Sequence, residues 1–185
     1  MDYIGHRIKR LPDTPHKIAM GIACGVFVTF TPFFGLHFLL AWFLASIFRG
    51  NILAAIMATF VGNPITFPII AASSYQLGLR ILNLNHEKTV WSKIHDSFQE
   101  AFNTLWANIR SIFGSEQSSW DGFLEFAQEV FLPYLIGGII PGLVVAGLFY
   151  VFSKPLIAGH QKRRRLKLQE RYARKMREEV EKKTF

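Results

Sequence analysis

The chain has 185 residues, of which 50% are hydrophobic and 18% charged, with a mean hydropathy of +0.22 and a formal net charge of +8. The charges are segregated, because residues 18–48, 50–79 and 130–153 contain no Asp, Glu, Lys or Arg. Each run exceeds the roughly 20 apolar residues that cross a bilayer, which excludes an ordinary soluble domain. The sequence predicts an all-α integral membrane protein.

The first apolar run predicts a hairpin. Residues 1–17 carry a net charge of +2 and are predicted to be cytoplasmic. As one helix, residues 18–48 would measure about 46 Å, too long for a single crossing, and Pro32 and Gly35 interrupt the run. We predict two re-entrant arms, residues 18–30 and 36–48, which return the chain to the cytoplasmic side.

The second run, residues 50–79, predicts a broken helix. Pro64 and Pro68 each remove a backbone donor from its middle. In hydrocarbon, irregular backbone is tolerated only where protein or a wet cavity covers it. We therefore expect the breaks of both runs to share one interior, within a membrane motif domain of residues 18–82.

The remaining chain predicts three further segments. Residues 83–129 read as an external amphipathic helix and linker, because residues 91–113 place apolar side chains at a spacing of three and four. Residues 130–153 read as the last transmembrane helix. Residues 154–185 contain 12 bases and 4 acids, which predicts a basic cytoplasmic helical tail. Both termini of this multi-pass chain are then cytoplasmic.

Polar side chains at the breaks and boundaries are the candidate substrate-binding residues: His37, Asn63, Thr66, Arg49 and Asn51. Residues that shape the backbone form a structural motif: Gly25, Pro32, Gly35, Pro64 and Pro68. Each polar candidate also has a purely structural interpretation. His37 would bond carbonyls at the hairpin turn, Asn63 would cap a half-helix, and Arg49 would mark a span boundary instead of clamping a phosphate with Asn51.

These residues carry a resemblance. The spacing is G-x-F-x-x-x-x-P-x-x-G-x-H from Gly25 to His37, followed by R-x-N at Arg49 and T-x-x-x-N-P-x-T ending at Thr66. It resembles the bacterial membrane family catalogued as domain of unknown function 2062, over about residues 17–82 and more loosely in the last apolar span. The resemblance implies a bacterial inner-membrane protein of undefined role. Some relatives are joined to glycosyltransferase-like domains, which points to envelope glycan or lipid work.

No catalytic signature such as H-E-x-x-H or G-x-S-x-G occurs, and Cys24 is the single cysteine, so we expect no enzyme, metal or cofactor. The leading hypothesis is handling or translocation of an anionic amphipathic envelope component, such as a lipid-linked precursor, by a homo-oligomer. The alternative is a membrane scaffold that recruits an envelope glycan or lipid enzyme such as a glycosyltransferase. The basic tail predicts contact with anionic lipid and disfavours nucleic acid, because aromatic side chains do not interleave its bases.

Overall fold

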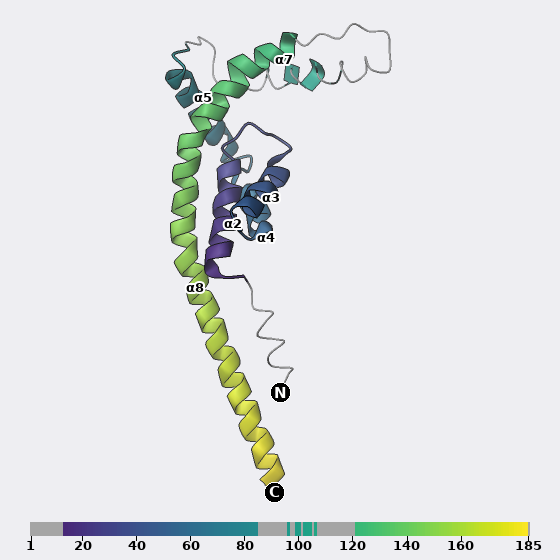
Figure 1. Ribbon diagram of the computed structural model, residues 1–185, viewed down its shortest axis with the longest axis vertical. Helices are drawn as coiled ribbons and strands as arrows, with labels where there is room; N and C mark the ends of the chain where they lie inside the picture. Colours follow the sequence, from purple (N-terminus) through teal and green to yellow (C-terminus); the bar gives the residue numbers. More distant parts are fainter. Residues whose placement is uncertain are drawn as a thin grey trace.

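The computed structural model describes residues 13–84, 96, 99–100, 102–104, 106 and 121–184 (Figure 1). Within these ranges all regular structure is helical and no strand occurs, so the all-α prediction is confirmed for them. The predicted amphipathic helix and linker lie for the most part outside the described residues. The main helices are α2 (Pro15–Val28), α3 (His37–Ile47), α4 (Ile52–Ala58), α5 (Phe67–Ile81), α7 (Asp121–Phe126) and α8 (Leu132–Thr184).

Helices α2 and α3 form the predicted helical hairpin. Pro15 starts α2 after the cap Thr14, where its missing N–H costs nothing. At the far end the hydroxyls of Thr29 and Thr31 donate to carbonyls of the last turn, each at 2.7 Å, just before Pro32. The chain reverses through a turn and α3 runs back. The open ends then meet, because the N–H of Asn51 donates to the carbonyl of Lys17 at 2.7 Å.

The second apolar run is broken at the predicted place. Helix α4 continues as a 3₁₀ turn, η1 (Thr59–Val61), and α5 begins only at Phe67. Helix α4 lies directly on α2, since a Cβ built on Gly21 or Gly25 would come within 2.2 or 2.1 Å of a backbone oxygen of residue 51 or 55. Only glycine permits this close approach of α2 and α4. The approach also places the break after α4 beside the hairpin turn, where Gly62 faces Thr29.

Helix α8 is the longest element and runs antiparallel to both α5 and α2 (Figure 1). It passes Gly78 of α5 at Pro133, Phe30 at the end of α2 at Gly138, and the start of α2 further on. At that start, Nδ1 of His16 lies 2.8 Å from the hydroxyl of Tyr150. Helix α2 is therefore the middle layer, with α8 on one side and α3 and α4 on the other.

The predicted last span and basic tail are not separate segments. A π-helical turn, η2 (Ala127–Phe131), leads into α8, which continues without interruption through Pro141 and Pro155 into the tail. Among the described residues, one helix, Leu124–Glu178, is long and apolar enough to cross a membrane by length and composition. The hairpin arms and α4 with η1 are shorter apolar helices of 10–17 residues.

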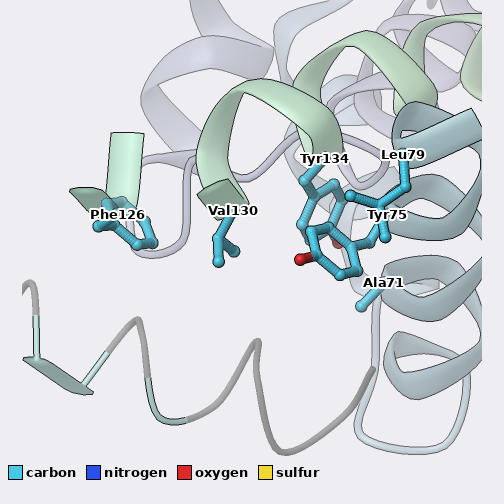
Figure 2. Packing of buried hydrophobic residues seen from close by; sticks show 6 residues of the cluster. All are labelled: Ala71, Tyr75, Leu79, Phe126, Val130 and Tyr134. Carbon is cyan, nitrogen blue, oxygen red and sulfur yellow. The ribbon is translucent and has the colours of Figure 1, made fainter. Parts of the chain in front are cut away.

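An aromatic core joins α5, the start of α8 and the hairpin turn. Figure 2 shows Tyr75 of α5 beside Tyr134 of α8, with Val130 and Phe126 following along η2 and α7. The hydroxyl of Tyr75 donates to the carbonyl of Glu129 at 3.1 Å. Phe34 from the hairpin turn packs against the same cluster. The core therefore fixes the start of α8 to α5 and to the hairpin at once.

We expect Gly137→Ala to destabilise the protein, because the added Cβ would lie 2.0 Å from the carbonyl oxygen of Ser74 and force α5 from α8. Overpacking of this kind costs about 1–3 kcal/mol. Gly147→Ala on the same helix is the matched control, since nothing lies within 4 Å of its Cβ position and alanine favours the helix. Thermal unfolding in detergent measures both. Equal melting temperatures for the two variants would contradict the close α5–α8 packing.

Candidate functional site

Two helix N-termini meet beside the ring of Phe34. His37 is the first residue of α3 and Phe67 the first of α5. Their ring centroids lie 5.8 and 4.9 Å from that of Phe34, and the ring of Tyr134 lies at 5.9 Å. The sequence predicted a shared interior for the two breaks, and within the described chain the hairpin turn and the broken helix do meet at this point.

His37 is held by the hairpin turn itself. Its Nε2 lies 3.3 Å from the carbonyl oxygen of Thr31, and the side chain is half-buried. This contact matches the structural interpretation, in which the imidazole bonds a carbonyl at the turn. Because that bond occupies Nε2, the other nitrogen, Nδ1, is the atom that the hydrogen bond leaves for a ligand.

The N-terminus of α3 has no side-chain cap. Its cap residue is Leu36, which offers no acceptor, and the first N–H that finds a carbonyl is that of Leu40, bonded to Leu36 at 2.9 Å. Within the described part of the chain, the N–H groups of residues 37–39 make no hydrogen bond. These groups carry the positive end of the helix dipole, so they favour an anion.

The turn that precedes α5 is closed by its own polar groups, although α5, like α3, has no side-chain cap among the described residues. Oδ1 of Asn63 accepts from the N–H groups of Ile65 and Thr66 at 2.9 and 3.1 Å, and the N–H of Asn63 donates to Oγ1 of Thr66 at 3.0 Å. The Thr66 hydroxyl also donates to the carbonyl of Val61. Asn63 and Thr66 therefore hold the turn before α5, and it is the backbone carbonyl of Asn63 that accepts from the first N–H of the helix, that of Phe67, at 2.8 Å.

Arg49 and Asn51 lie at the opposite end of the hairpin. Asn51 caps α4 by accepting from the N–H of Ala54 at 2.7 Å, and its amide donates to the carboxylate of Asp13 at 2.5 Å. Arg49 is exposed and adopts a left-handed backbone conformation with φ of 52°. The 11 residues of α3, about 16 Å of helix, separate this pair from His37. The five polar candidates thus form two groups.

The motif residues explain the backbone. Gly25 admits α4, as described above, and Gly35 takes a φ of 82° at the hairpin turn, which favours glycine. Pro32 is buried and ends the α2 arm. Pro64 lies exposed in the turn before α5, and Pro68 lies in the first turn of that helix, where a missing N–H leaves no bond unmade.

The structure adds three residues that sequence reasoning missed. Phe34 connects the two helix N-termini, although the sequence marked it only as part of the turn. Ser74 of α5 and Tyr134 of α8 are completely buried, and their hydroxyls find no hydrogen-bond partner in the described chain. A glycine at position 78, one helical turn after Ser74, was the available signal, because it marks the face of α5 that meets α8.

Comparison with protein families matches residues 1–166 to a family described as an uncharacterized protein conserved in bacteria, domain of unknown function 2062. The chain belongs to this family. The match confirms the resemblance and reaches beyond the motif segment of residues 17–82, through the external segment and into the first part of the tail. No curated protein and no solved structure matches the chain.

We expect Asn63→Ala and Thr66→Val to be strongly coupled, because each residue bonds the other's backbone or side chain. Each single variant should lose about 1 kcal/mol, the usual net value of a hydrogen bond, and the double variant should lose clearly less than the sum. A double-mutant cycle from unfolding in detergent measures the coupling. Ser73→Ala, which removes an exposed hydroxyl from α5, is the control. If the losses of stability in the two single variants add up to the loss in the double variant, the mutual hydrogen bonds of Asn63 and Thr66 are contradicted.

Proposed function

We propose that this chain is a multi-pass protein of the bacterial inner membrane that handles an anionic amphipathic envelope component, such as a lipid-linked precursor. The observation that carries the proposal is the uncapped N-terminus of α3 beside His37, at the level where both apolar runs are broken. The family supports a bacterial origin and leaves the role open.

The arrangement of charges supports two cytoplasmic termini. Lys17 at the start of α2 and Arg49 after α3 lie at one end of the hairpin, joined through the Asn51 contact. The same end of α2 bonds Tyr150, and Lys154 lies 5.6 Å from the ring of that tyrosine. These bases fall at one level along α8, which is the distribution that the positive-inside rule gives to a cytoplasmic boundary.

The hairpin then ends in the interior of the bilayer. Phe30 at its tip faces Gly138, which lies eight residues into the apolar run of α8. Helix α3 covers about 16 Å, roughly half of a ~30 Å hydrocarbon core. Its outward side chains are large and apolar, as lipid contact requires: Phe38, Leu39, Trp42, Phe43 and Ile47.

Unbonded N–H groups at that depth have a physical consequence. Each costs several kcal/mol in hydrocarbon unless water or another acceptor reaches it. The N-terminus of α3 therefore draws polar groups toward the interior and offers an anionic head group a favourable position. In this scheme Nδ1 of His37 and the adjacent N–H groups receive the head group, and Arg49 attracts it at the cytoplasmic boundary.

A homo-oligomer completes the proposal. The described helices place α8 and α3 on outer faces that expose large apolar side chains, for example Leu143 and Trp42. With so few helices, a single copy has little protein to enclose a path for a polar head group. We propose that a second copy supplies the missing wall.

The second candidate is a membrane scaffold that recruits or stabilises an envelope enzyme. One observation favours it: Asn63 and Thr66 use their polar atoms within their own turn, so this break is closed by intramolecular bonds. On this reading both breaks only fit helices together, and the region around Phe34 stays dry.

Accessibility of the hairpin tip distinguishes the two candidates. In a Cys24→Ser background we expect Leu36→Cys to react with a membrane-impermeant thiol reagent in intact vesicles, because water reaches the tip. Ile140→Cys is the matched control: its side chain is 55% exposed against 52% for Leu36, but it lies on unbroken α8. An unreactive Leu36→Cys, labelled only after detergent is added, would favour the scaffold.

Lipid movement tests the handling role directly. Vesicles containing the purified protein should speed the transfer of fluorescent phosphatidylglycerol between leaflets, measured by quenching of the outer leaflet. His37→Gln keeps a donor for the Thr31 carbonyl but loses the imidazole, so we expect normal folding and a rate lower by about fivefold, or roughly 1 kcal/mol. A parent protein without effect on the transfer rate would count against the handling role.

A further inference from the structure

A second polar feature lies on α8, beyond its apolar run. A shallow, open hollow of about 560 Å³ lies between exposed side chains of this one helix, and five of its six described lining residues carry basic nitrogen: His160, Arg163, Arg164, Lys167 and Arg171. The sixth is Leu168. None of these residues takes part in the hairpin or in the broken helix.

The spacing of the basic residues explains why they converge. Positions 160, 164, 167 and 171 differ by four, three and four residues, which places them on one face of an α-helix. From 160 to 171 the helix rises about 17 Å. Lys162, Arg165 and Arg177 lie away from this face. The sequence therefore places more positive charge on one side of the helix than an even distribution of its basic residues would.

The charge of this face is not compensated within the protein. In the described chain, none of the five basic side chains forms an ion pair or a hydrogen bond. Arg174, one turn further on, differs: its Nε lies 3.1 Å from Oε1 of Glu178. Closely spaced cations without a counter-ion repel one another, and a bound anion relieves that repulsion.

We propose that this hollow binds the phosphate of an anionic ligand, either a free phosphate compound such as a diphosphate or the head group of an anionic lipid. Three arginines offer planar guanidinium groups that match phosphate oxygens with paired hydrogen bonds. Leu168 supplies an apolar wall for the part of the ligand that carries the phosphate.

The phosphate has two possible sources with the same chemistry. His160 lies seven residues, or about 10 Å of helix, beyond Ser153, the end of the apolar run, which the proposed function places at the start of the head-group layer. A lipid head group can therefore reach the nearer bases, while a free phosphate ester can reach all of them. The site stands independently of the hairpin tip, because the two lie at different levels of α8 and share no residue.

The test compares two variants of the full chain that lose the same charge. The hollow variant removes three basic residues from the hollow and carries Arg164→Gln, Lys167→Gln and Arg171→Gln. The control variant also removes two arginines and one lysine, but from other faces, and carries Lys162→Gln, Arg165→Gln and Arg177→Gln. Glutamine keeps the helix propensity in both. In the first measurement, inorganic pyrophosphate is titrated calorimetrically into each detergent-solubilised protein. In the second, each protein is placed in nanodiscs of neutral lipid with or without phosphatidylglycerol, and the retention of lipid is measured.

We expect the hollow variant to lose at least about tenfold in affinity for pyrophosphate or in phosphatidylglycerol retention, and the control to change less than threefold. Pyrophosphate binding in detergent identifies a free phosphate compound, and an effect confined to anionic nanodiscs identifies a lipid head group. Equal losses in both variants, or no binding of either probe, would overturn the proposal. Tighter binding of a short RNA duplex, lost only in the hollow variant, would also overturn it in favour of nucleic acid.

Discussion

The structure depends on the close approach of backbones at glycine. Gly21 and Gly25 bring α2 against α4 on one side, while Gly138 brings α8 against the end of α2 on the other. In each case a side chain would collide with a carbonyl oxygen, so the helices can lie this close only where the side chain is missing. Because α2 is held from both sides, its hairpin turn is fixed beside the break that precedes α5.

This packing explains why the hairpin turn and the break before α5, which are far apart in the sequence, lie side by side in the structure. Pro32 ends one arm and the Gly62–Thr66 turn separates α4 from α5, but neither would have a partner on an isolated hairpin. Phe34 fills the space between the two N-termini and contacts the start of each helix. The two termini nevertheless differ in chemistry: Asn63 bonds the turn before α5 and its carbonyl accepts from the N–H of Phe67, whereas in the described chain the first N–H groups of α3 have no such partner.

Sequence reasoning predicted the elements better than the contacts. Proline, glycine and the absence of charge predicted the hairpin and the broken helix, because these signals act locally along the chain. They did not predict that α8 would continue from the last apolar run into the tail, since the first charge after that run, on Lys154, was taken as the boundary between two segments. The complete burial of Ser74 and Tyr134 was also not predicted, because it depends on the packing of two helices whose residues lie 60 positions apart in the sequence.

The candidate site shows the same limit. The sequence could not tell whether the side-chain oxygen of Asn63 binds a ligand or its own turn. The structure shows that it accepts from the N–H groups of Ile65 and Thr66. The basic tail was predicted as a charged, solvated helix, while the face that gathers five bases follows from the helix being continuous. One α8 therefore links the level of the hairpin turn to the basic hollow, with Pro141 and Pro155 as the two positions between them where a helix bends most readily.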